Sequence, residues 1–136
     1  MDLVNQNVLI TGAADGLGLA ISKSFANTKA NLFLIDINYD KLIENNISNA
    51  KNIKCDLSNI NSLINLITKF NEEKVYIDIL IHNAAVLVPK SYEETTYKYW
   101  NEMTNISLNS GYLLSNYAWT NMKKNKKGII IFVSSR

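Results

Sequence analysis

The stretch Thr11-Gly12-Ala13-Ala14-Asp15-Gly16-Leu17-Gly18 decides the fold of this chain. It follows the apolar run 8–10 and precedes a segment of helical periodicity, so it joins a predicted strand to a predicted helix. In such a loop Gly12 permits a tight turn, Gly16 lets backbone approach a pyrophosphate, and Gly18 lets the helix pack close to the strand. The helix then directs unpaired N–H groups and its positive dipole end at the phosphates. The loop therefore predicts a dinucleotide site rather than a purely structural turn.

Further apolar runs alternate with longer amphipathic stretches along the chain. The runs are rich in β-branched residues and lack strict alternation, which is typical of strands buried on both faces of a parallel sheet. They cover residues 32–35, 52–55, 77–81 and 129–133, and the run at 52–55 is the weakest.

Apolar residues at helical spacing separate these runs. The first predicted helix buries Leu17, Ala20, Ile21, Ser24 and Phe25. The next buries Ile60, Leu63, Ile64 and Ile67, with Ser58 as its N-cap. A long helix is predicted over 97–124, with small residues Ser107, Ser110 and Gly111 that allow close packing on the sheet, and a buried stripe of Met103, Ile106, Leu113, Leu114, Tyr117 and Ala118.

Strand and helix in regular succession predict an α/β fold with a doubly wound parallel sheet, the Rossmann fold. The expected strand order is 3-2-1-4-5, and a single domain covers residues 1–136. The ligand crevice is expected at the carboxyl ends of the strands, where strands 1 and 4 diverge.

Composition narrows the classes of partner. The formal net charge is only +2, which gives no electrostatic argument for nucleic acid or an anionic membrane. The lysines within 123–127 lie where a helix is expected to end, a position that the helix dipole favours for cations. Cys55 is the single cysteine, no signal peptide is recognisable, and no apolar run approaches the ~20 residues of a membrane span, so a cytoplasmic protein is expected.

Asp36 ends the second predicted strand, 36 − 18 = 18 residues beyond the last glycine of the loop. An acid at this position accepts hydrogen bonds from the ribose hydroxyls of an adenosine and repels a 2′-phosphate. Neither the glycine loop nor the residues directly after Asp36 supply a lysine or arginine, so NAD is preferred over NADP. The alternative is that Asp36 is an N-cap acid of a helix over 38–47.

The spacing Thr-Gly-x-x-x-Gly-x-Gly near the amino terminus resembles the classical short-chain dehydrogenase/reductase family. The resemblance covers nearly all of this chain and about the first half of the family's length, so the C-terminal strands of the sheet are absent from it. The cofactor-binding residues that it implies are Gly12, Asp15, Gly16, Leu17, Gly18, Asp36, Ile37, Asp56, Leu57, Asn83, Ala84 and Ala85.

Two landmarks after later strands support this resemblance. It implies that Asp56, followed by Leu57, binds the adenine amino group, and the alternative is a charge that stabilises a helix N-terminus. His82-Asn83-Ala84-Ala85 partly matches the family's Asn-Asn-Ala-Gly, with Ala85 in place of a glycine close to the cofactor. His82, the only histidine, is interpreted as structural, because nothing nearby completes a metal site.

The resemblance also implies two catalytic residues. Asn105 matches the helix asparagine that holds a water in a proton relay, and Ser135 matches the serine that hydrogen-bonds the substrate oxygen. The family's proton donor is the tyrosine of a Tyr-x-x-x-Lys motif. None of the seven tyrosines of this chain precedes a lysine by four residues.

The leading hypothesis is an oxidoreductase that moves hydride between a nicotinamide and a small alcohol or carbonyl substrate, represented here by an incomplete chain. Its full-length form is expected to be a homo-oligomer. The alternatives are a non-catalytic NAD-binding module, complete at this length, and an inert gene remnant. Extended short-chain enzymes such as sugar-nucleotide epimerases usually space the glycines as Gly-x-x-Gly-x-x-Gly, unlike this loop.

The run 129–133 predicts the behaviour of the isolated chain. As a bare apolar sheet edge it favours aggregation and argues against a module that evolved to end here. We expect residues 1–136 alone to be poorly soluble and to show no dehydrogenase turnover. Robust NAD-dependent oxidation of alcohols by the pure chain, measured by absorbance, would contradict this expectation.

Overall fold

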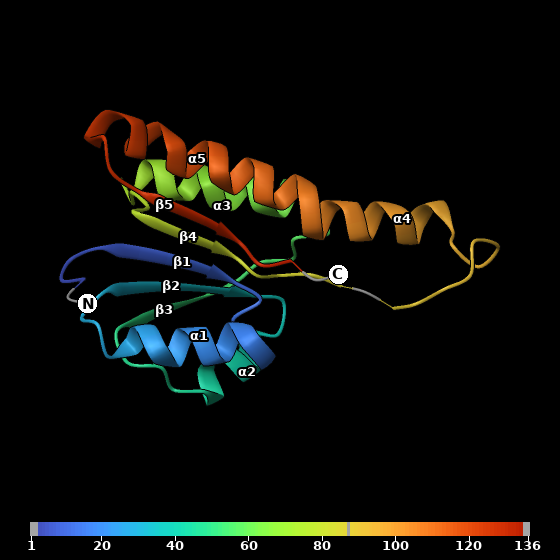
Figure 1. Ribbon diagram of the computed structural model, residues 1–136, viewed down its shortest axis with the longest axis horizontal. Helices are drawn as coiled ribbons and strands as arrows, with labels where there is room; N and C mark the ends of the chain where they lie inside the picture. The colour runs from blue at the N-terminus through green and yellow to red at the C-terminus, as the bar shows by residue number, and fades with distance from the viewer. Residues whose placement is uncertain (1–2, 87, 135–136) are drawn as a thin grey trace.

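A computed structural model describes residues 3–86 and 88–134, which form a parallel sheet between two layers of helices (Figure 1). The strand order is β3-β2-β1-β4-β5, with every neighbouring pair parallel, which confirms the expected order. The strands are β1 (Asn7–Thr11), β2 (Asn31–Asp36), β3 (Ala50–Lys54), β4 (Ile79–His82) and β5 (Ile129–Phe132).

The helices divide between the two faces of the sheet. α1 (Gly16–Ala26) and α2 (Tyr39–Glu44) cover one face, and α3 (Ile60–Glu72) and α5 (Ser110–Asn125) cover the other (Figure 1). α4 (Tyr97–Thr104) runs through a π-helical segment, η1 (Asn105–Asn109), into α5. No helix in the described ranges is both long and apolar enough to cross a membrane.

Alternate residues of each inner strand enter different cores, which explains why the strands read as continuous apolar runs. In β1, Val8 and Ile10 pack in the core under α1, whereas Leu9 packs with α3 and α5. The edge strand β5 differs, because Ile129 is 47% exposed and Phe132 is 50% exposed.

The residues of α1 that are buried differ in part from those predicted. Leu17 is 56% exposed, and Ala20 and Ser24 are also exposed. Ile21 and Phe25 are partly buried and pack against the core under α1, as predicted. The prediction was wrong for Leu17, Ala20 and Ser24, because the buried residues beside this core are Gly18, which packs on the Gly12 backbone, and Ser22.

Two further corrections concern α3. Its N-cap is Asn59, whose side chain accepts hydrogen bonds from the N–H groups of Asn61 and Ser62, and not Ser58. Ile64, expected to be buried, is 46% exposed. The buried residues are Leu63, Leu66 and Phe70.

The helical path predicted over 97–124 is present, but the π-helical turn of η1 interrupts its α-helical pattern. The small residues Ser110 and Gly111 are buried against the sheet, as expected. A Cβ on Gly111 would lie 2.5 Å from the Phe132 ring and 2.9 Å from the His82 ring. The glycine therefore sets how closely α5 approaches β4 and β5.

Phe70 offers a test of the core beneath α3. It is 1% exposed. Its ring packs edge-on against the Phe33 ring, with 5.6 Å between the ring centres, and tilted against the Tyr117 ring, with 5.9 Å between the ring centres. We expect Phe70→Ala to lower the free energy of unfolding by about 3–5 kcal/mol, because it removes these contacts and leaves a cavity. Chemical denaturation measures the change. Tyr92→Ala, at a side chain that is 92% exposed, should change stability by no more than about 0.5 kcal/mol, and equal effects of the two variants would contradict this core.

Candidate functional site

The loops at the carboxyl ends of the strands line an open cavity of about 570 Å³, which we call the carboxyl-edge cavity. An open α/β sheet binds its ligands at this edge. Most of the predicted cofactor residues meet there, whereas Leu17 and Gly18 do not line it. The lining residues that the sequence predicted are Gly12, Asp15, Gly16, Asp36, Ile37, Asp56, Leu57, Asn83, Ala84 and Ala85.

Three lining residues were not predicted, namely Cys55, Val86 and Ile106. They are apolar and belong to no motif. The sequence feature that could have identified them is that each lies directly beside a residue of a predicted motif. Burial raises the pKa of the Cys55 thiol, so this side chain stays neutral and packs rather than reacting as a nucleophile.

The glycine loop is shaped by close backbone contacts. Gly12 has a φ of +65°, in the left-handed region that favours glycine. A Cβ on Gly18 would lie 2.0 Å from the Gly12 carbonyl oxygen and 2.6 Å from Asn83 Nδ2. Asn83 Nδ2 itself donates to the carbonyl oxygens of Thr11, at 3.1 Å, and Gly12, at 3.2 Å. Around Gly16, in contrast, a Cβ would meet no atom within 4 Å. The loop thus packs tightly against the strands and leaves open space at Gly16.

Asp15 is the N-cap of α1. Its carboxylate accepts from the Gly16 N–H at 2.7 Å and forms an ion pair with Lys41 of α2. The hydrogen bonds from Lys41 and Gly16 hold the pKa of this carboxyl below its usual value. Lys41 lies five positions after Asp36, so the sequence did not show that it returns to the glycine loop. Asp15 and Gly16, at the amino end of α1, line the carboxyl-edge cavity, so the positive end of the helix dipole faces it.

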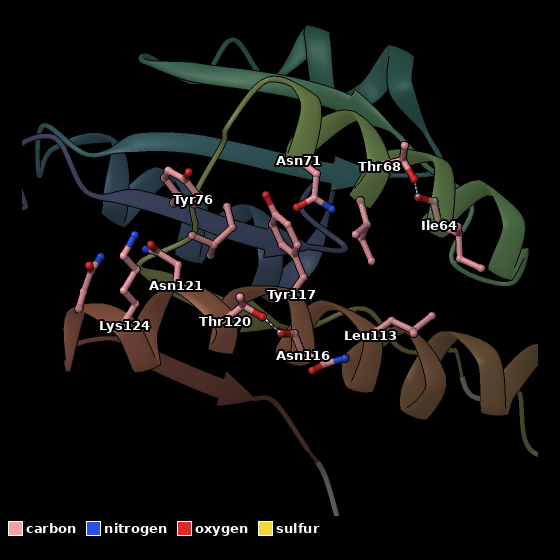
Figure 2. Close-up of a pocket in the computed structure, with 13 residues that line it drawn as sticks. Ile64, Thr68, Asn71, Tyr76, Leu113, Asn116, Tyr117, Thr120, Asn121 and Lys124 are labelled. Carbon is pink, nitrogen blue, oxygen red and sulfur yellow. Dashed lines mark hydrogen bonds between the residues drawn. The ribbon is translucent and has the colours of Figure 1, made fainter.

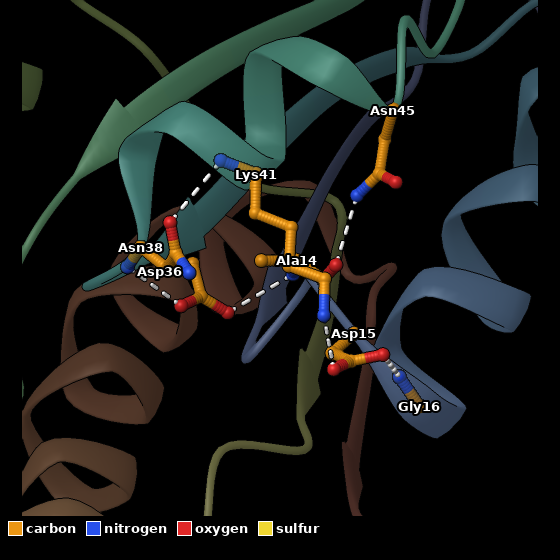
Figure 3. A network of polar contacts seen from close by, with 7 residues as sticks. All are labelled: Ala14, Asp15, Gly16, Asp36, Asn38, Lys41 and Asn45. Carbon is orange, nitrogen blue, oxygen red and sulfur yellow. Dashed lines mark hydrogen bonds and ion pairs between the residues drawn. The ribbon is translucent and has the colours of Figure 1, made fainter.

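Asp36 connects the glycine loop to α2 (Figure 3). One carboxylate oxygen accepts from the Ala14 N–H and the other from the Asn38 N–H, both at 2.9 Å. Each oxygen has two lone pairs, so each keeps one for a ligand in the cavity. The N-cap of α2 is Asn38, whose side chain accepts from Lys41 N–H. The alternative that Asp36 is the N-cap of this helix is therefore wrong.

Asp56 and Asn105 are joined through Ser58. Asp56 Oδ1 accepts from the Ser58 N–H at 2.9 Å and from the Ser58 hydroxyl at 2.7 Å. Asn105 Nδ2 donates to the Ser58 carbonyl at 2.8 Å. Asn105 does not line the cavity, although its neighbour Ile106 does. Ser135, the other predicted catalytic residue, lies outside the described residues.

His82 lies at the end of β4 and is 2% exposed. Its Nδ1 is 3.1 Å from the Thr11 hydroxyl, and its Nε2 is 3.3 Å from the Ser107 carbonyl oxygen. Burial lowers the pKa of the imidazole. The described part of the chain contains no group of three or more side chains suited to holding a metal ion.

A groove between α3 and α5, of about 710 Å³, is larger than the carboxyl-edge cavity (Figure 2). Tyr76 and Ile77, which precede β4, line it, so it lies beside the amino end of that strand. Tyr117 in this groove donates its hydroxyl to the Val75 carbonyl, and burial raises its pKa to about 12. Such a tyrosine is no base at neutral pH, and the groove lies away from the edge where open α/β sheets bind ligands. The carboxyl-edge cavity is therefore the candidate site.

Comparison with known proteins identifies a family. The family model described as "short chain dehydrogenase" matches residues 6–136. A 3-oxoacyl-(acyl-carrier-protein) reductase of Buchnera aphidicola is 31% identical over 99% of this chain, and sorbose reductase of Schizosaccharomyces pombe is 30% identical over 98%. The chain covers 57% and 56% of these two proteins, so it spans about half the length of the curated relatives it matches.

Solved structures show the same fold. A 4-hydroxyisoleucine dehydrogenase complexed with NADH superposes with a TM-score of 0.86 at 26% identity, over 96% of this chain and 56% of that protein. A metagenomic short-chain oxidoreductase in complex with NADP gives a TM-score of 0.87 at 25% identity, over 98% and 63% respectively.

The packing at Gly18 gives a test of the loop geometry. We expect Gly18→Ala to lower the free energy of unfolding by about 1–3 kcal/mol, because the new methyl group overlaps the Gly12 carbonyl and the backbone must shift. Chemical denaturation of the two proteins measures this. Ser24→Ala, on the exposed face of the same helix, is the control and should change stability by no more than about 0.5 kcal/mol. Full stability of Gly18→Ala would contradict the described contact.

Proposed function

We propose that this chain, which belongs to the short chain dehydrogenase family, binds a nicotinamide dinucleotide in the carboxyl-edge cavity. The observation that carries the proposal is the meeting of the glycine loop, the amino end of α1 and Asp36 at one cavity. Tight loop packing at Gly18 and open space at Gly16 fit a pyrophosphate that approaches bare backbone. The proposed protein is an oxidoreductase of which this chain forms the cofactor-binding part.

Each wall of the cavity has a proposed partner in the cofactor. The N–H groups at the start of α1 bind the pyrophosphate, beside Gly12 and Gly16. Asp36 accepts from the hydroxyls of the adenosine ribose, and Asp56 accepts from the adenine amino group. The remaining lining residues contribute shape, with Ile37 and Leu57 at the adenine and Asn83, Ala84 and Ala85 along the neighbouring wall.

The charges around the cavity support NAD rather than NADP. Asp15, Asp36 and Asp56 contribute carboxylates to the lining. Lys41 reaches this region, but its ammonium group is paired with Asp15. A 2′-phosphate beside Asp36 would therefore meet a like charge without a compensating cation among the described lining residues. Since the similar structures include complexes with NADH and with NADP, the preference rests on these side chains.

The proposed reaction exchanges hydride between the cofactor and a small alcohol or carbonyl compound. The bound nicotinamide supplies or accepts the hydride. In this chain Asn105 is the proposed holder of a relay water, and Ser135 is the proposed hydrogen-bond partner of the substrate oxygen. The whole protein is proposed to act as a homo-oligomer in the cytoplasm, and the free, buried Cys55 of this chain is consistent with a reducing compartment.

Substitution of Asp36 tests the cofactor assignment. We expect Asp36→Ala to weaken NADH binding by roughly tenfold, the size expected for losing a charged hydrogen bond. NADPH binding should weaken less or improve, because the repulsion of the 2′-phosphate is gone. Fluorescence titration with each nucleotide measures both constants.

Two companion variants sharpen this test. Asp36→Asn keeps one acceptor oxygen and removes the charge, so it should relax discrimination against NADPH and disturb the loop less. Asp40→Ala removes an exposed acid of α2 outside the cavity and should leave both affinities unchanged. Unchanged discrimination in both Asp36 variants would contradict the role of Asp36. Absence of NADH binding by the folded, soluble fraction of the unaltered chain would overturn the proposed function.

A further inference from the structure

The buried imidazole of His82 joins two segments whose neighbouring residues, Gly12 and Ile106, line the carboxyl-edge cavity. On one side it meets Thr11, the last residue of β1, directly before Gly12 of the glycine loop. On the other side it meets the carbonyl of Ser107, inside the π-helical segment η1. These two contacts determine which nitrogen of the ring carries the proton.

The Thr11 hydroxyl has its acceptor capacity filled. Its oxygen accepts from the Asn83 N–H at 3.1 Å and from the Ala84 N–H at 3.0 Å. A hydroxyl has two lone pairs and one hydrogen, so the Thr11 hydrogen remains for His82 Nδ1. Nδ1 is therefore an acceptor without a proton.

The contact at the other nitrogen leads to the same tautomer. A carbonyl oxygen only accepts, so His82 Nε2 must donate its hydrogen to Ser107. The ring is thus neutral, with its proton on Nε2. An added proton on Nδ1 would face a hydroxyl oxygen whose lone pairs are both in use, and one of the backbone contacts from Asn83 or Ala84 would have to break.

Among the residues that the structure describes, the groups identified around the ring include no charged side chain. Thr11 faces it from β1, and Phe132 of β5 packs edge-on at 5.2 Å between ring centres. Gly111 of α5 and the backbone of η1 cover the remaining described sides. The lowered pKa of the imidazole, caused by burial, agrees with this account.

The segments that His82 joins carry the proposed cofactor site. Asn83 and Ala84, whose N–H groups donate to the Thr11 hydroxyl, line the cavity. Ile106, which precedes Ser107 in η1, also lines it. Asn105, two residues before Ser107, continues the connection through the Ser58 carbonyl towards Asp56. Hydrogen bonds and the short backbone segment between Ser107 and Asn105 thereby connect the glycine loop, β4, η1 and the loop after β3.

We propose that His82 is a positioning residue, whose neutral Nε2–H form holds the glycine loop and the η1 turn at the spacing that the dinucleotide requires. This inference rests on the proposed function, since it concerns the geometry of that same cavity. Protonation of His82 opens the link to Thr11, so affinity for the cofactor falls as the pH drops through the pKa of the buried ring, which lies below the ordinary histidine value.

The first experiment reads the ring directly. His82 is the only histidine in the chain, so ¹⁵N NMR of the full chain gives one imidazole spin system without mutagenesis. We expect a neutral ring protonated at Nε2 at about pH 7.5, with a pKa below the ordinary value of about 6.5. A ring protonated at Nδ1, or charged at that pH, would overturn the proposal.

The second experiment measures NAD⁺ binding by calorimetry from about pH 7.5 to about pH 5.5. The unaltered chain should lose affinity with a midpoint that follows the NMR titration of His82. His82→Phe keeps a ring of similar shape without either hydrogen bond. It should bind roughly tenfold more weakly at the higher pH, the size expected for a lost buried hydrogen bond, and its affinity should depend less on pH.

Two amide variants separate the contacts and guard against simple misfolding. His82→Asn places an acceptor near the Nδ1 position and should keep the Thr11 contact, whereas His82→Gln places a donor near the Nε2 position and should keep the Ser107 contact. Each should recover part of the affinity that His82→Phe loses, and neither should respond to pH through residue 82. Wild-type affinity and pH profile in His82→Phe would refute the positioning role. Absence of NAD⁺ binding by the unaltered chain would instead refute the proposed function. The NMR measurement of the imidazole tautomer would then test only the hydrogen bonds from His82 to Thr11 and Ser107.

Discussion

The close contact between Gly18 and the Gly12 carbonyl is the constraint on which the other features of the site depend. It brings the amino end of α1 against the end of β1, where only a residue without a Cβ fits. The Asn83 side chain donates to the Thr11 and Gly12 carbonyls and so fixes the loop to the end of β4. In the loop held by these contacts, open space remains at Gly16 and the Ala14 N–H donates to Asp36.

The cavity combines carboxylates with a helix end suited to anions, and local hydrogen bonds make the two compatible. Asp15, Asp36 and Asp56 each accept from backbone N–H groups of neighbouring residues, which orients them before any ligand arrives. Asp15 is in addition neutralised by Lys41. Carboxylates that are already oriented lose little conformational entropy when a ligand binds. They can therefore select for a ribose with little loss of binding free energy.

The sequence predicted the sheet and the edge where the site lies, because buried runs, turn glycines and their spacing are local features. It did not predict that Leu17 of α1 is exposed, because the orientation of the first turn depends on the contact between Gly18 and Gly12 of the preceding loop. The π-helical segment η1 changes the backbone hydrogen bonding over one turn, and no residue type within it marks that change in the sequence. Likewise Lys41 and His82 gained partners from other segments, which the order of residues along the chain does not show.

The central claim is that a nicotinamide dinucleotide lies across the carboxyl edge of this sheet. A crystal structure of the chain grown with NADH tests it most directly. The account predicts the pyrophosphate beside the backbone at the start of α1, with the hydroxyls of the adenosine ribose hydrogen-bonded to Asp36. A dinucleotide in the groove between α3 and α5, or one whose adenosine points away from Asp36, would contradict the account.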